Sequence, residues 1–308
     1  MKRQAQHVNT NRHINDDVEI PMVGFGTFQI ANEDTASAVQ TALEVGYRHI
    51  DTAAVYQNEK GVGEGIKKGL TSAGLARSDI FVTTKLWPGY AACGEKSKTY
   101  EDTLAAFDES LAALGLDYID LYLIHSPHGG SERLAQWRAL CDLQQSGKVR
   151  AIGVSNYNQK HIEEIKQAGM RLPDVNQIEL HPWSQKPELV GWLAENNIVP
   201  VAYSSLAPLS TWRNKAGETS AKSEAMKNEA NIFATMAAKY GVSEAQFLLR
   251  WAIQKGYPVL PKSLNVERMR QNLSLFGFEI DEDDMLKIET MDRGNGIAWE
   301  TGDPSQVD

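Results

Sequence analysis

The feature that most constrains the fold of this chain is a repeated alternation between short apolar segments and longer amphipathic segments. Short runs rich in β-branched and apolar residues are typical of buried strands, whereas apolar residues spaced three and four apart are typical of helices. The short runs cover Pro21–Gly26, His49–Asp51, Ile80–Lys85, Ile119–His125, Val149–Ser155, Val175–Leu180, Ile198–Tyr203 and Val259–Lys262. Helical patterns between them include Glu33–Val45, Tyr100–Leu114, Ala135–Ser146, His161–Ala168 and Glu188–Asn196.

Each expected strand is followed by a connection long enough for the crossover that a parallel sheet requires. Eight such units in 308 residues predict an α/β fold, a (β/α)8 TIM barrel with long loops at its C-terminal face, for which about 250 residues is typical. A doubly wound open sheet is the alternative. No linker divides the chain, so we expect a single domain over 1–308. The polar stretch Ser210–Lys227 is expected to be a long loop, and Gly294–Asp308 an irregular tail.

Composition excludes several classes of partner. Forty acidic residues against 31 basic ones give a net charge of −9, so attraction to nucleic acid or to anionic lipid should be weak. No apolar run has the length of a secretory signal or a membrane span, which favours a cytoplasmic protein. The two cysteines, Cys93 and Cys141, lie in unrelated contexts, so they predict neither a disulfide framework nor a zinc cluster.

Polar and ionisable side chains recur where the expected strands end. In (β/α)8 barrels the chemistry lies at these carboxyl ends. The residues found there are Asp51, Lys85, His125, Ser155 with Asn156, Gln177 with Glu179, Tyr203 and Lys262. This clustering predicts a site at one mouth of the barrel.

Tyr56 lies five residues beyond Asp51, in the loop that follows the second expected strand. A barrel would bring it to the same mouth as Asp51, Lys85 and His125. A neighbouring ammonium favours a phenolate, so Lys85 is expected to lower the pKa of Tyr56 from about 10 and to make it a usable acid–base group. Two other interpretations stay open on these residues alone: an ordinary Asp51–Lys85 salt bridge with Tyr56 merely packing, and a structural role for His125.

Six segments, in this order along nearly the whole chain, resemble the landmarks of the aldo-keto reductases. They are Gly-Tyr-Arg-His-Ile-Asp-Thr-Ala (46–53) with Tyr56, Thr-Lys-Leu-Trp (84–87), Asp-Leu-Tyr-Leu-Ile-His (120–125), Gly-Lys-Val-Arg-Ala-Ile-Gly-Val-Ser-Asn (147–156), Asn-Gln-Ile-Glu (176–179) and Leu-Pro-Lys-Ser (260–263). The resemblance implies an NADPH-dependent reductase of aldehyde or ketone carbonyls. It implies a catalytic tetrad of Asp51, Tyr56, Lys85 and His125.

In that tetrad Tyr56 would protonate the carbonyl oxygen, and His125 would orient the carbonyl. Lys85, held by Asp51, would tune Tyr56. The resemblance further implies a small-molecule carbonyl substrate, and the acidic composition and the lack of a long apolar run predict no nucleic-acid or membrane partner. We expect a monomer. A cofactor-binding regulatory subunit without rapid turnover is the alternative from another functional class.

Cofactor positions carry over residue by residue. By resemblance, Ser155, Asn156 and Gln177 hold the carboxamide of the nicotinamide, and Tyr203 stacks on its ring. Positions near the ribose and pyrophosphate are Gly26, Thr27, Ser204 and Leu206, with Phe28 and Asp51 beside them. Positions that grip the adenosine and its 2′-phosphate are Lys262, Ser263, Asn265, Arg268, Gln271 and Asn272. Candidates for the substrate pocket are Phe28, Trp87, Tyr90, His125 and Trp299.

Two departures from the family pattern and two competing motifs bear on these expectations. Phe28 stands where many relatives carry tryptophan, and Ser205 where they carry proline, so the pocket shape and the path of the following loop do not carry over from the family. The glycines of 61–65 follow no strand, so they are expected to begin a helix rather than a dinucleotide-binding loop. His125 and His128 have no partnering carboxylates or cysteines, so no metal site is expected.

Overall fold

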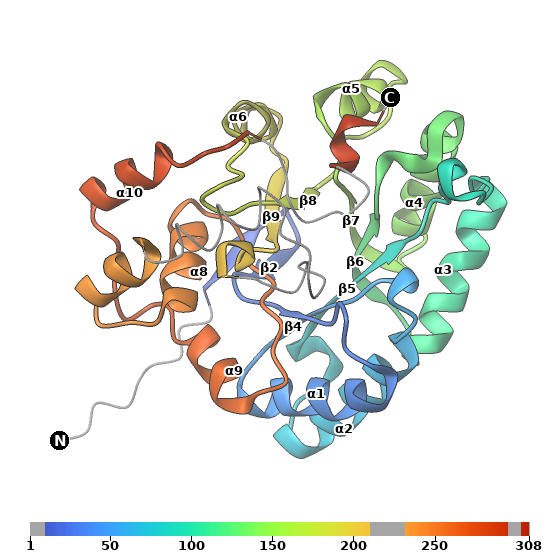
Figure 1. The fold of residues 1–308 in the computed structure, drawn as a ribbon. Coiled ribbons are helices and arrows are strands. Elements are labelled where there is room, and N and C mark those ends of the chain that lie inside the picture. Colours follow the sequence, from blue (N-terminus) through green and yellow to red (C-terminus); the bar gives the residue numbers. More distant parts are fainter. Residues whose placement is uncertain (1–9, 210–231, 295–302, 308) are drawn as a thin grey trace.

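Seven parallel strands curl into a sheet at the centre of the molecule, and helices surround it (Figure 1). The computed structural model describes residues 10–209, 232–294 and 303–307. The strands are β3 (Phe25–Gly26), β4 (His49–Asp51), β5 (Phe81–Leu86), β6 (Ile119–Ile124), β7 (Val149–Ser155), β8 (Val175–Glu179) and β9 (Val199–Tyr203). Each pairs in parallel with its neighbours in chain order.

Val259 closes this sheet into a barrel. It forms parallel bridges to Val23 on one side and to Ala202 on the other. The Gly24 amide donates to the Val259 carbonyl at 2.8 Å, and the Val259 amide donates to the Met22 carbonyl at 2.9 Å. The predicted (β/α)8 architecture is confirmed, and the doubly wound alternative is wrong. The first and last strands are shorter than expected, since the pairing is confined to two residues of β3 and to single bridges.

Pro21 does not belong to the first barrel strand as expected. It ends β2 (Glu19–Pro21), which pairs antiparallel with β1 (Asn11–His13). The side chains of Ile14, Val18 and Ile20 from this hairpin are buried in one cluster with interior residues of the barrel. The hairpin therefore closes the amino-terminal end of the barrel.

The five helices with expected ranges match them to within about two residues. They are α1 (Asn32–Val45), α3 (Tyr100–Leu114), α4 (Arg133–Gln145), α5 (Gln159–Gln167) and α6 (Pro187–Glu195). The structure also contains α2 (Glu59–Ala73), α8 (Glu244–Gln254), α9 (Val266–Leu273) and α10 (Glu282–Glu289), and residues 232–239 are helical. Thr99, Asn158 and Ser243 cap three of them through their side chains. The glycines of 61–65 lie in α2, as predicted.

Parts of the predicted loops fall outside the described residues: Ser210–Lys227, and most of Gly294–Asp308 with Trp299. The described end of the chain, 303–307, lies beside α5, where the Asn158 side chain donates to the Ser305 carbonyl at 2.7 Å (Figure 1). Among the described residues, no helix is long and apolar enough to cross a membrane.

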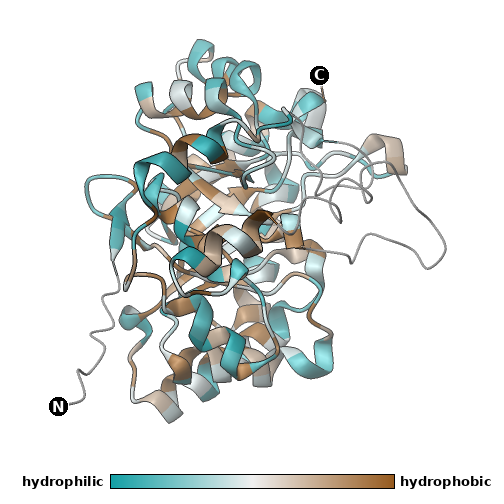
Figure 2. Ribbon diagram, turned by 60° about the vertical axis from the view of Figure 1, so that its left-hand side comes forward, coloured by the Kyte–Doolittle hydropathy of each residue, from teal (hydrophilic) through white to brown (hydrophobic). Residues whose placement is uncertain are grey.

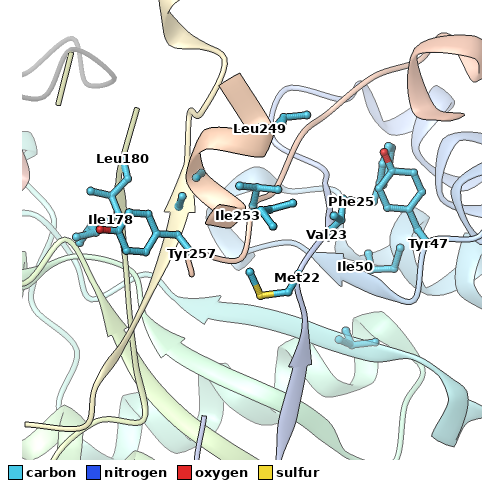
Figure 3. Close-up of a cluster of buried hydrophobic side chains, with 14 of the residues drawn as sticks. Met22, Val23, Phe25, Tyr47, Ile50, Ile178, Leu180, Leu249, Ile253 and Tyr257 are labelled. Atoms are coloured by element: carbon cyan, nitrogen blue, oxygen red, sulfur yellow. The ribbon is translucent and has the colours of Figure 1, made fainter. Parts of the chain in front are cut away.

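Alternation along the strands separates two cores. Outward residues such as Ile50 and Val82 pack against the helices, and Figure 3 shows Met22, Phe25 and Ile253 within this layer. Inward residues fill the barrel; they include Phe81, Leu121, Leu123, Val175 and Val201. Segments of hydrophobic residues are accordingly concentrated in the interior of the molecule (Figure 2). Because successive side chains point to opposite faces, the inward rows continue into the polar residues at the strand ends.

Candidate active site

Lys85 is the centre of the polar cluster at the carboxyl ends of the strands. Its side chain is fully buried, and its Nζ donates to Asp51 Oδ1 at 2.6 Å, to the Thr52 carbonyl at 2.8 Å and to the Tyr56 hydroxyl at 3.5 Å. These three acceptors match the three protons of the ammonium. A buried cation is tolerated when it is paired and hydrogen-bonded in this way. The structure thus brings Asp51, Lys85 and Tyr56 into direct contact.

Two residues that the sequence analysis did not single out fix the turn carrying Tyr56. The turn is a 3₁₀ segment, Ala54–Tyr56. After it, the buried Asn58 donates from Nδ2 to the Thr27 carbonyl at 3.0 Å. The buried Glu59 accepts from Thr84 Oγ1 at 2.6 Å, which ties the turn to the strand that carries Lys85. Both residues look like ordinary helix-start residues in sequence, because these partners are 31 and 25 positions away.

The pKa of Tyr56 shifts in the direction opposite to the sequence-based expectation. Burial raises the pKa of this phenol above its usual value; the Lys85 ammonium lowers it and Asp51 raises it, and the net shift is upward. For Lys85, burial lowers the pKa, but Asp51 and Tyr56 outweigh that effect and the net shift is upward. Near neutral pH the site therefore holds a protonated phenol beside a charged ammonium, an arrangement suited to donating a proton.

His125 joins this group from the end of β6. Its imidazole packs edge-on against the Tyr56 ring, with centroids 5.5 Å apart, and against Trp87, with centroids 5.8 Å apart. Burial drives the pKa of His125 well below its usual range, and the charges of Lys85 and His128 add to this. The ring is therefore neutral near pH 7. A neutral imidazole beside the Tyr56 ring can donate a hydrogen bond without bringing a second cation to Lys85.

A second hydrogen-bonded group lies beside the tetrad. The Tyr203 hydroxyl donates to Asn156 Oδ1 at 2.6 Å, and Asn156 Nδ2 donates to Ser155 Oγ at 3.1 Å and to the His125 carbonyl at 2.9 Å. Ser155 Oγ donates to the Gln177 carbonyl at 2.7 Å, and Gln177 Nε2 donates to Asp51 Oδ2 at 2.8 Å. The residues expected to hold the carboxamide thus form one network that reaches Asp51.

The loop positions expected around a ribose and pyrophosphate flank this network. The Thr27 amide and hydroxyl both donate to the Asp51 carbonyl at 3.0 Å. A Cβ on Gly26 would lie 2.7 Å from the Leu260 carbonyl oxygen, so this approach of two strands needs a glycine. Ser204 adopts a left-handed φ of 52° directly after β9, and Leu206 follows it half-buried.

The residues between Lys262 and Asn272 that were expected to bind the adenosine and its 2′-phosphate lie in different environments. Lys262, in the segment before α9, and Arg268, in the first turn of α9, are both exposed. Asn265 Oδ1 accepts from the Arg268 amide at 3.0 Å, so this side chain caps the helix, and Ser263 Oγ accepts from the Asn265 amide at 3.1 Å. Asn272 is buried close to Tyr47, whereas Gln271 is half-buried.

Aromatic side chains form one wall of the mouth. Phe28, 48% exposed, packs on the Tyr56 ring at 5.1 Å between centroids. Tyr90 stacks on His128 at 3.9 Å, and His128 Nδ1 shares a hydrogen bond of 2.8 Å with Ser126 Oγ. From the sequence, His128 was considered only as a metal ligand. Among the described residues, no group of His, Cys, Asp and Glu side chains has the arrangement of a metal site.

Comparisons with known proteins agree with this geometry. A family model described as "Aldo/keto reductase family" matches residues 22–293. An uncharacterized oxidoreductase of Bacillus subtilis is 39% identical over 303 residues, which is 98% of this chain and 99% of that protein. Glyoxal reductase of Bacillus subtilis is 39% identical over 286 residues, covering 92% and 94%. The structure of a Bombyx mori aldo-keto reductase in complex with NADP superposes with a TM-score of 0.83 at 33% identity, covering 95% of each chain.

Proposed function

The chain belongs to the aldo/keto reductase family, and from that premise we propose that it is an NADPH-dependent carbonyl reductase with Tyr56 as its proton donor. One observation carries the proposal: the buried Lys85 Nζ contacts both Asp51 and the Tyr56 hydroxyl. A phenol of raised pKa beside a fixed ammonium is protonated at rest and has a cation ready to stabilise the phenolate that remains after proton transfer.

In this proposal each of the four residues has one task. Tyr56 gives its proton to the carbonyl oxygen, where negative charge develops during reduction. Lys85 stabilises the resulting phenolate, and Asp51 holds Lys85 in place through the 2.6 Å ion pair. His125, as a neutral donor beside the Tyr56 ring, hydrogen-bonds the same oxygen and orients the carbonyl. Preorganised donors aimed at a developing charge commonly contribute about 10²–10³-fold each.

The residues at the barrel mouth fit the cofactor that the family implies. NADPH, when bound, supplies the hydride. Gln177 Oε1 receives no hydrogen bond from the described residues, so it can accept from the nicotinamide amide. Ser155 and Asn156 already donate within the protein and would have to exchange partners to donate to the carboxamide oxygen. Ser155 Oγ and Asn156 Oδ1 each accept one hydrogen bond and keep a second lone pair that can accept from the –NH2. Tyr203 would stack on the ring, and Lys262 and Arg268 would hold the 2′-phosphate.

The substrate proposal is a small aldehyde or α-dicarbonyl. Support comes from the aromatic wall of Phe28, Trp87 and Tyr90, and from the similarity to glyoxal reductase. Steady-state oxidation of NADPH with glyoxal, methylglyoxal and benzaldehyde tests the proposal. We expect saturable turnover of at least one of them. Cofactor binding without turnover of any carbonyl would instead favour a regulatory, non-catalytic barrel.

A further inference from the structure

The side chain of Asp51 has two hydrogen-bonding oxygens, and they serve different partners. Oδ1 accepts from Lys85 Nζ at 2.6 Å, and Oδ2 accepts from Gln177 Nε2 at 2.8 Å. We infer that Asp51 is a positioning residue for the cofactor as well as for Lys85, because it fixes which end of the Gln177 amide faces the ligand. This inference rests on the proposed function, since the ligand is the nicotinamide amide.

Burial shields the contact between Asp51 and Gln177 from water. Asp51 is 4% exposed and Gln177 is 3% exposed, and Lys85 beside them is fully buried. Water therefore has little access to replace either partner. Gln177 lies on β8, across the barrel from β4 and β5, so the hydrogen bond also links opposite sides of the mouth.

The chemistry of the two groups determines the orientation of the amide. A carboxylate that is ionised and paired with an ammonium can only accept hydrogen bonds. Gln177 must therefore turn its nitrogen toward Asp51, which leaves its carbonyl oxygen, Oε1, directed elsewhere. No donor among the described residues occupies this oxygen. Gln177 then offers an acceptor to a ligand, and the –NH2 of a nicotinamide carboxamide is a donor.

Asp51→Asn would reverse this orientation while preserving the shape of the side chain. Lys85 needs an acceptor, so the carbonyl of the substituted amide would face it and the new –NH2 would face Gln177. Gln177 would then have to turn its own oxygen toward position 51 and present –NH2 to the ligand amide. Two donors would face each other. A hydrogen bond lost in a buried site costs about tenfold in affinity.

The test measures binding, not turnover. The dissociation constants of NADP⁺ and of its 3-acetylpyridine analogue, which lacks the N–H donor, are compared by calorimetric titration. For the unaltered chain we expect a preference of about tenfold for NADP⁺. For Asp51→Asn we expect this preference to disappear. An unchanged preference in Asp51→Asn would overturn the inference.

Two variants serve as controls. Tyr56→Phe removes the other side-chain partner of Lys85 without touching Gln177, so it should retain the preference for NADP⁺. Gln177→Met removes the acceptor, so it should abolish the preference, and adding Asp51→Asn to it should change the ratio no further. If Asp51→Asn does not fold, Gln177→Met still keeps the inference falsifiable, because a preference that survives this substitution contradicts it. If the unaltered chain binds neither nucleotide, the proposed function itself fails.

Discussion

Tyr56 is subject to two opposing influences at the scale of single residues. Burial raises the pKa of the phenol, and the Lys85 ammonium lowers it. The sequence shows that Lys85 and Tyr56 should meet, so the lowering effect could be predicted. The larger raising effect could not, because it depends on how closely Phe28 and His125 cover the ring.

Replacing Lys85 by Met tests this balance. We expect turnover to fall by about a hundredfold or more, because the phenolate formed by proton donation loses its counter-charge. Reduction requires protonated Tyr56, so its rate declines as pH rises through the pKa of that phenol. Since Lys85 lowers this pKa, its loss should move the alkaline decline to higher pH. The measurement is the pH profile of kcat/KM, and an unchanged profile at full activity would reduce Lys85 to a structural ion pair.

At the scale of elements, the bounds of the strands from β4 to β9 were predictable to within one residue, whereas the lengths of the first and last strands were not. The apolar runs of β5 and β8 are visible in the sequence, and so are the polar residues Lys85 and Gln177 near their carboxyl ends. Gly24, directly before the short first strand, is required by close packing: a Cβ there would lie 2.5 Å from His49 Nδ1. Contacts between distant segments, such as Gln177 with Asp51, leave no mark in local sequence patterns.

The start of α9 offers a test of cofactor choice. Arg268 is exposed in the first turn and can grip a phosphate with its planar fork, with Lys262 adding charge from the preceding segment. Arg268→Ala should weaken NADPH binding by roughly ten- to a hundredfold and leave NADH, which has no 2′-phosphate, nearly unchanged. Fluorescence titration with both nucleotides measures this. Equal losses of affinity for NADPH and NADH would show that this segment does not bind the 2′-phosphate.

The loop after β5 offers a test of the pocket wall. Glu95 Oε2 accepts from Trp87 Nε1 at 2.5 Å and from the Tyr90 amide at 3.1 Å, so one carboxylate holds both aromatic residues. Glu95→Ala should raise KM for benzaldehyde by about three- to tenfold with little change in kcat for glyoxal. Glu95→Gln keeps an acceptor and should resemble the unaltered enzyme. A loss of kcat for both substrates would place the effect on the tetrad instead.

At the scale of the whole molecule, the barrel interior makes stability depend on pH. His49 points into the barrel, where its ring packs on Phe81 at 5.0 Å and its Nε2 shares a hydrogen bond of 2.9 Å with Thr83 Oγ1. Burial, together with the charge of Lys85, lowers the pKa of His49 from 6.5 to about 3. Between pH 6.5 and about 3, His49 is therefore protonated in the unfolded chain but neutral in the folded chain.

This difference in protonation makes the folded state less stable at low pH. As pH falls from about 6.5 towards 3, His49 should lower the free energy of unfolding by up to about 1.4 kcal/mol per pH unit. His49→Gln removes the titrating group, so the free energy of unfolding in urea should depend less on pH in this variant, by up to one proton. If the free energy of unfolding depended equally on pH in the unaltered chain and in His49→Gln between about pH 6 and 4.5, His49 would be protonated in the folded state as it is in the unfolded state.

We propose that the buried cluster around Lys85 makes Tyr56 the proton donor of an NADPH-dependent carbonyl reductase. The most direct test of this proposal is Tyr56→Phe, which removes one hydroxyl and leaves the Asp51–Lys85 ion pair in place. NADPH oxidation with the best substrate and NADPH affinity are measured side by side. We predict that turnover falls by several orders of magnitude while the affinity stays within about threefold, because the lost contact acts on the transition state. Turnover above a tenth of the original rate would contradict the account.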